Sequence, residues 1–224
     1  MKSSADVSST MMKVDLSINH FLDRAGTLFP TNEIVSRLPD KSLVRHTYAQ
    51  FYERTRSLAQ GLKDLGLKKG DRVATLCWNH HAHLESYFGI PAAGGVMHTL
   101  NLRLSPDEIA WIANDAQDRF LIIDDILLPL YRQFAHLYSF EKVIVFPFSG
   151  APVPAEFLDY ELWLAGIDDS AIFVFDVAAD PNAQAIVQQC ATDAAHVYLP
   201  STGAALKDAF HAIGEDISRL RISR

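Results

Sequence analysis

The residues best placed to do chemistry form one polar cluster, residues 78–83 (WNHHAH). The cluster follows a short apolar run at residues 72–77, which has the pattern of a buried strand, and it opens a helical stretch. In parallel α/β sheets, ligands bind beyond the carboxyl ends of the strands. We therefore predict that Trp78, Asn79 and His80 are substrate-binding residues.

The histidines of this cluster allow two other interpretations. Imidazole is a good zinc ligand, but His80 and His81 are sequence neighbours and cannot share one helix face. No cysteine beside them completes a ligand set, so the sequence predicts no metal site. The structural alternative is that Asn79 caps the helix and that the histidines are partly exposed.

Other polar or glycine-rich runs carry weaker signals. The glycines of residues 89–95 (GIPAAGG) lie between a helix and a strand. A phosphate cradle needs them between a strand and a helix, so here they indicate close packing and a helix end. The acid pairs at 124–125 and 168–169 are interpreted as solvated turns.

Helical and strand-like stretches alternate along the chain. Apolar spacing of 3.6 residues predicts helices near residues 17–29, 47–65, 81–93, 106–116, 127–137 and 159–164. Apolar runs predict strands at 72–77, 96–100, 119–123 and 142–146, with a shorter one at 32–35. Thr47 and Ser105 are expected N-caps, and Gly66 is an expected C-cap. The pattern predicts an α/β fold with a layered, largely parallel sheet flanked by helices.

The composition narrows the class of protein. The chain has 224 residues, 49% of them hydrophobic, and a formal net charge of -7, which argues against nucleic acid as a partner. No apolar run reaches the roughly 18 residues of a membrane span, and residues 1–15 lack the core of a secretory signal. We expect a cytoplasmic protein in which Cys77 and Cys190 are free thiols.

From residue 47 onward, the chain resembles the N-terminal subdomain of fatty-acyl-CoA synthetases, in the AMP-binding, adenylate-forming superfamily. The matching pieces occur in order: LGLKKGDRVA, the W-N element at Trp78-Asn79, the L-N-x-R-L element at residues 100–104, and the S-P-x-E-I helix start. The KVIVF strand and the DYELWLA helix also fit. The resemblance covers roughly residues 16–165.

This resemblance implies ATP-dependent formation of an acyl-adenylate, followed by transfer to coenzyme A, with Mg²⁺ as a cofactor. The family holds its phosphates in a loop of the form Y-T-S-G-T-T-G-x-P-K-G. Residues 198–207 (YLPSTGAALK) are the sole counterpart, with Ser201, Thr202 and Lys207 as candidate nucleotide-binding residues. They lack the dense glycine and hydroxyl spacing, so we expect this chain to bind none of these cofactors alone.

Residues 167–224 differ in sequence pattern from the rest of the chain, and this pattern predicts a short βαβα tail. This tail resembles the closing part of the von Willebrand A-type region of tight-adherence pilus-assembly proteins. The expected organisation is a flexible tail at 1–15, a synthetase-like subdomain at 16–166 and this fragment. The predicted function is that of a truncated fatty acid–CoA ligase. The alternative is a non-enzymatic interaction module or non-functional chimera, and unpaired apolar surface could drive self-association.

Overall fold

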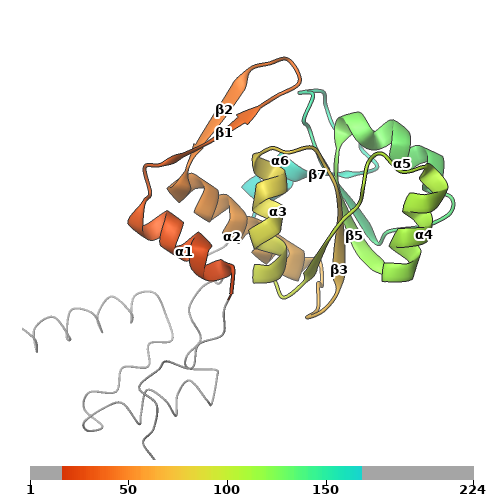
Figure 1. Ribbon diagram of the computed structural model, residues 1–224, viewed down its shortest axis with the longest axis horizontal. Coiled ribbons are helices and arrows are strands. Elements are labelled where there is room, and N and C mark those ends of the chain that lie inside the picture. Colours follow the sequence, from red (N-terminus) through yellow and green to blue (C-terminus); the bar gives the residue numbers. More distant parts are fainter. Residues whose placement is uncertain (1–16, 168–224) are drawn as a thin grey trace, which may run out of the picture. The chain divides into compact units, whose positions relative to one another are not determined.

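The computed structural model describes residues 17–167, which belong to the first of two compact units of the chain, Met1–Ile167. Its centre is a five-stranded sheet in the order β4-β3-β5-β6-β7, in which all neighbouring strands are parallel. The predictions for residues 1–15 and 168–224 lie outside the described residues. The predicted parallel α/β fold is confirmed (Figure 1).

Strands and helices alternate in the order that the sequence predicts. The strands are β3 (Arg72–Leu76), β4 (Val96–Thr99), β5 (Asp118–Asp124), β6 (Lys142–Phe146) and β7 (Leu158–Asp159). The helices are α1 (Asn19–Leu28), α2 (Tyr48–Asp64), α3 (His81–Ala92), α4 (Pro106–Ala116), α5 (Leu128–Phe134) and α6 (Tyr160–Ala165), with a 3-10 turn η1 (Asp125–Leu127) before α5.

Local capping signals set the helix ends. Thr47 and Ser105 both form capping boxes, with Gln50 and Glu108 as the reciprocal partners. Gly66 follows α2 with a φ of 86°, a left-handed conformation that glycine adopts without strain. These predicted caps are confirmed.

The two faces of the sheet bury alternate residues of each strand. On one face, strand side chains pack into a single core cluster with α4 and α5, which Figure 1 shows together on one side of the sheet. The strand residues of this cluster are Ala74, Leu76, Leu121, Ile123 and Val145. The intervening residues Val73, Phe120, Ile122 and Ile144 are also fully buried, on the side where α2 and α3 lie (Figure 1). Burial on both faces explains the nearly continuous apolar runs.

Helices α2 and α3 approach each other closely at a glycine. A Cβ atom on Gly89 would lie 2.8 Å from Cδ2 of Leu58, closer than real side chains come. Gly94, in the turn after α3, has a φ of 90°. The interpretation of residues 89–95 as close packing and a helix end is therefore confirmed.

A two-stranded antiparallel hairpin lies beside the helices. It is formed by β1 (Glu33–Arg37) and β2 (Leu43–Thr47), with Val35 opposite Arg45. The sequence predicted β1 only in part and missed both β2 and the two-residue β7. In β2 the polar Arg45 and His46 follow each other, so the strand shows no clean alternation of apolar and polar residues.

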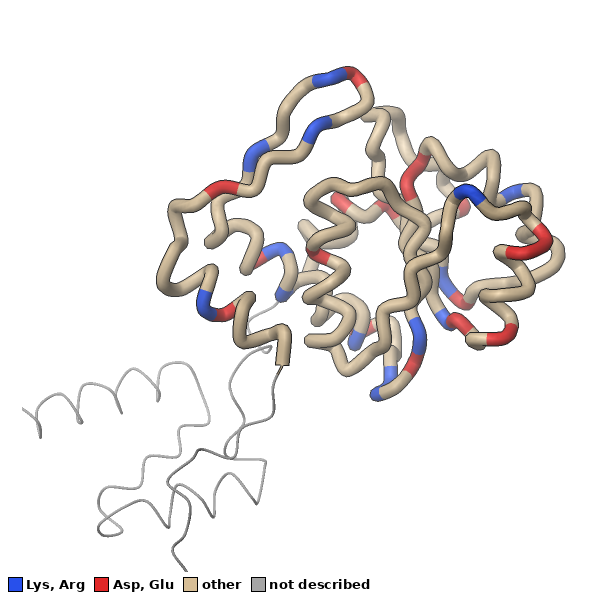
Figure 2. The backbone as a smooth tube through the Cα atoms, in the orientation of Figure 1, with Lys and Arg blue, Asp and Glu red and all other residues tan. Residues whose placement is uncertain are grey.

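Charge and hydropathy of the described part agree with the composition. Lys and Arg are interspersed with Asp and Glu along the backbone rather than gathered on one element (Figure 2). Among residues 17–167, no helix is both long enough and apolar enough to cross a membrane.

Candidate functional site

The candidate site is built where β3 and β5 end side by side. The connection after β3 carries Trp78, Asn79 and His80, and β5 ends at Asp124. Asp124 holds this connection with both carboxylate oxygens: Oδ2 accepts a hydrogen bond from the backbone N–H of Trp78 at 2.7 Å, and Oδ1 lies 2.8 Å from Nε2 of His80. One buried carboxylate therefore fixes the segment predicted to bind substrate.

Asp124 itself overturns one prediction. The pair Asp124-Asp125 was expected to form a solvated turn, yet Asp124 is 0% exposed. In the sheet, Leu76 is the register partner of Ile123, so Asp124 follows Ile123 directly beside the loop that follows Leu76. Only Asp125 has the expected turn role, accepting hydrogen bonds from Ile126 and Ser149 near the surface.

The histidines are also more buried than predicted. His80, His81 and His83 are 6%, 4% and 8% exposed, so the expectation of partial exposure is wrong. The His80 ring stacks against Phe146 and Phe148, with centroid distances of 4.6 Å to each. These phenylalanines come from the end of β6 and the residues after it, which close over the loop.

Helix α3 is not capped by Asn79. Its N-cap residue is His80, whose side chain makes no capping hydrogen bond. The N–H of His81 instead donates to Oγ of Ser36 at 2.8 Å, so a side chain of β1 satisfies this free amide of the helix start. This bond ties the hairpin to the site.

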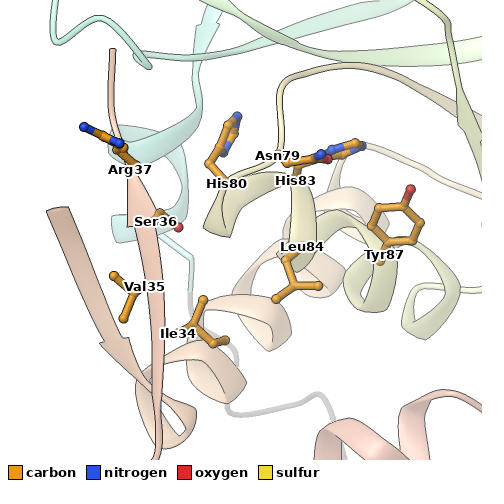
Figure 3. Close-up of a pocket in the computed structure, with 9 residues that line it drawn as sticks. All are labelled: Ile34, Val35, Ser36, Arg37, Asn79, His80, His83, Leu84 and Tyr87. Atoms are coloured by element: carbon orange, nitrogen blue, oxygen red, sulfur yellow. The ribbon is translucent and has the colours of Figure 1, made fainter. Parts of the chain in front are cut away.

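A pocket of about 440 Å³ opens between β1 and α3 (Figure 3). Its lining residues are Ile34, Val35, Ser36, Arg37, Asn79, His80, His83, Leu84 and Tyr87. Of the predicted substrate-binding residues, Asn79 and His80 line this pocket. Trp78 is 44% exposed and is not among the lining residues.

The pocket combines an aliphatic wall with polar groups free to bind. Ile34, Val35 and Leu84 form the wall. No ion pair of Arg37 occurs within residues 17–167, and Nδ1 of the buried His80 lacks a hydrogen-bond partner in the same part of the chain. Such a pocket suits a small acid with an apolar chain.

Sequence reasoning missed the half of the pocket that comes from β1. Ser36 and Arg37 lie about 45 positions before the cluster they face, in a hairpin that was predicted only in part. A single sequence carries no signal for that contact.

The buried thiol of Cys77 lies beside the same carboxylate. Ligand atoms of Cys77, His80 and Asp124 all lie within 4.8 Å of one another, and all three residues are buried. Burial raises the pKa of the Cys77 thiol well above its ordinary value, and the neighbouring Asp124 raises it further. The statement that no cysteine stands beside these histidines is therefore wrong.

His46 of β2 packs on His81 on the hairpin side, with ring centroids 4.5 Å apart. Burial lowers the pKa of His46 to about 4, with further lowering from His81 and Arg54 and an opposing effect of Glu161. The folded protein therefore keeps His46 neutral at pH values where the unfolded chain, with an ordinary pKa of 6.5, binds a proton.

We predict that this histidine makes the fold less stable in mild acid. Between pH 6.5 and about 4 the unfolded state binds more protons at His46, so the unfolding free energy falls as the pH falls. In urea titrations across this range, His46→Gln should show a shallower pH dependence, by up to one proton per molecule. His136→Gln makes the same change at an exposed position and is the control. Equal slopes for both variants would contradict the assignment.

Comparisons with known proteins show which family this chain matches. The family model described as "AMP-binding enzyme" matches residues 22–160. The chain belongs to this family. It is 53% identical over 122 residues to a long-chain-fatty-acid–CoA ligase of Thermus thermophilus. This match covers 54% of this chain and 23% of that relative. It is 39% identical over 120 residues to a 3-methylmercaptopropionyl-CoA ligase of Ruegeria lacuscaerulensis, covering 54% of this chain and 22% of that ligase.

Solved structures share the fold. An acetoacetyl-CoA synthetase from Streptomyces lividans matches with a TM-score of 0.60 at 21% identity, covering 67% of this chain and 25% of that one. The anthranilate–CoA ligase AuaEII matches with a TM-score of 0.56 at 23% identity, and the match covers 67% of this chain and 27% of that ligase. The chain spans about a quarter of the length of the curated ligases named above. The resemblance to acyl-CoA ligases is confirmed for this AMP-binding part, and the von Willebrand-like tail lies outside the described residues.

Proposed function

We propose that this chain is the N-terminal part of an ATP-dependent fatty acid–CoA ligase and does not complete the reaction alone. The observation that carries the proposal is the 53% identity to the Thermus ligase, within a family match that spans residues 22–160. The name of that relative supports a long-chain fatty acid and coenzyme A as substrates of the whole enzyme, and the match to the AMP-binding family supports ATP.

We propose that the described residues do not hold the triphosphate by themselves. Attack of a carboxylate on the α-phosphate requires donors and Mg²⁺ around the polyphosphate, which glycine-rich strand-to-helix turns commonly provide. The connections that follow β3, β4 and β5 toward α3, α4 and η1 contain no glycine. The connection after β6 contains Gly150 but leads to β7 rather than to a helix. These observations support the proposal that residues 17–167 do not hold ATP and Mg²⁺ alone. Ser201, Thr202 and Lys207 lie outside the described residues and stay a prediction.

The acid is the substrate that the described part can contact. We propose that Asn79 and His80, in the connection before α3, contact it, while the lining residue Arg37 at the end of β1 supplies a positive charge. An Arg guanidinium binds a carboxylate with paired hydrogen bonds, and the aliphatic wall contacts the first carbons of the chain. Trp78 was predicted with them, but its exposed position outside the pocket removes it from this proposal.

Two assays separate the parts of the proposal. The chain alone should give no ATP–pyrophosphate exchange with any fatty acid of a chain-length series. A chimera of the Thermus ligase, in which residues 17–167 of this chain replace the matching segment, should be active. We expect its kcat/KM for fatty acids to stay within about 100-fold of the parent, because packing between the two sequences will be imperfect.

Each of these two assays has an outcome that would contradict the proposal. Exchange by the unmodified 224-residue chain would contradict the claim that it is incomplete. A chimera that folds, as judged by circular dichroism, yet forms no acyl-adenylate would contradict the ligase assignment and favour the non-enzymatic alternative. Arg37→Met in the active chimera should raise the KM for the acid more than it lowers kcat.

A further inference from the structure

The function proposed above uses His80 as a pocket residue but gives no role to its close grouping with Cys77 and Asp124. The three side chains come from the residue after β3, the N-cap of α3 and the last residue of β5. Their ligand atoms lie within 4.8 Å of one another, and the side chains of His80 and Asp124 are fully buried. A thiol, an imidazole and a carboxylate rarely meet in a core without a reason, because burial of ionisable groups is costly.

We propose that Cys77, His80 and Asp124 bind a zinc ion. Zinc takes sulfur, nitrogen and oxygen ligands in tetrahedral geometry, and this set offers one of each. A thiolate and a carboxylate carry two negative charges, which balance the two positive charges of the ion beside a neutral imidazole. The loaded site is therefore neutral, which suits its burial. On binding, Cys77 gives its proton to solvent as the sulfur–zinc bond forms.

The geometry requires small movements. Zinc–ligand distances of about 2.0–2.3 Å place tetrahedral ligands roughly 3.3–3.8 Å apart. The distance between Nε2 of His80 and Oδ1 of Asp124 is now 2.8 Å, so these atoms must separate by about 0.5–1 Å to admit the ion. The thiol of Cys77 now donates to the carbonyl of Ile122 at 3.5 Å, a weak bond that is easily exchanged.

The surroundings hold the carboxylate in place for this role. Oδ2 of Asp124 accepts the backbone N–H of Trp78 at 2.7 Å, which leaves Oδ1 to reach the metal. Outer hydrogen bonds of this kind orient ligating carboxylates in metal sites. Three protein ligands leave a fourth position for water or an added ligand, and one of the three, His80, also lines the pocket.

Cobalt(II) titration of the full chain tests the site directly. Cobalt replaces zinc in tetrahedral sites and reports a bound thiolate by a charge-transfer band. We expect one equivalent of cobalt to produce this band and one equivalent of zinc to abolish it. Cys77→Ser should remove the band and weaken zinc binding at least tenfold. Cys190→Ser changes the one other cysteine and should keep both.

A second variant protects the test against misfolding of the first. His80→Gln leaves the thiol in place but should also weaken zinc binding at least tenfold, with folding checked by tryptophan fluorescence. Zinc binding that is unchanged in folded Cys77→Ser and His80→Gln variants would overturn the proposal and assign the ion to surface histidines. Absence of the charge-transfer band in the unmodified chain would overturn it too.

Discussion

Replacing Arg54 by Met should lower the free energy of unfolding by about 3–5 kcal/mol. Arg54 of α2 bonds two carboxylates from two other helices: its Nε donates to Glu85 of α3 at 2.6 Å, and its Nη2 donates to Glu161 of α6 at 2.7 Å. The side chain of Glu85 is fully buried, and its second oxygen accepts the hydroxyl of buried Tyr160 at 2.7 Å. Without the guanidinium, Glu85 is a buried charge with no cation beside it.

The size of the loss comes from Glu85 rather than Glu161. The side chain of Glu161 is 37% exposed, so water replaces much of what it loses. Burial alone would raise the pKa of Glu161, but the His81 ring 3.8 Å away and the hydrogen bonds from Arg54 outweigh that effect and lower the pKa to about 2. The measurement is urea unfolding followed by tryptophan fluorescence, since Trp78, Trp111 and Trp163 all lie within residues 17–167.

A surface pair provides the matched control. Arg132 bonds Glu156 at 3.2 Å, with both side chains more than half exposed, so Arg132→Met should cost less than about 1 kcal/mol. The double variant Arg54→Met with Glu85→Gln should recover part of the loss, because no uncompensated charge remains. Equal effects of Arg54→Met and Arg132→Met would show that the three-helix network contributes little.

Local signals were sufficient to predict the helices and the four longer parallel strands of this fold. The caps at Thr47 and Ser105 need only residues three positions away, and both formed as predicted. The apolar runs of β3, β5 and β6 reflect burial on both faces, which each strand shows independently of its neighbours. The edge strands β2 and β7 were missed because they are short or half polar, so their pattern carries little information.

Long-range contacts could not be predicted in the same way. Arg54 meets Glu161 across 107 positions and Ser36 meets His81 across 45, and neither pair has a spacing that signals contact. The position of Asp124 was easier to predict, because it ends a buried parallel strand at the same sheet edge as His80. It was missed because the pair Asp124-Asp125 was judged as one unit, whereas Asp124 is the last residue of the buried strand β5 and Asp125 begins the turn η1.

Because Asp124 is buried and Asp125 lies near the surface, we expect replacing Asp124 to have the second large effect on stability. Asp124→Ala should destabilise the protein by about 2–5 kcal/mol, because it leaves the buried ring of His80 and the part-buried N–H of Trp78 without their partner. Asp125→Ala should cost about 1 kcal/mol or less, since its partners Ile126 and Ser149 can bond water instead. The two variants change the same charge at adjacent positions, so net charge cannot explain a difference between them.

Hydrogen exchange distinguishes loss of the site from a general loss of stability. In the metal-free chain, Asp124→Ala should speed exchange of the Trp78 amide far more than exchange in β6, because the loop after β3 loses the acceptor that orders it. A uniform increase across both segments would mean that Asp124 acts only on the core. A local increase would mean that this buried carboxylate orders Asn79 and His80 for the pocket, since the loop has no other acceptor at Trp78 among the described contacts.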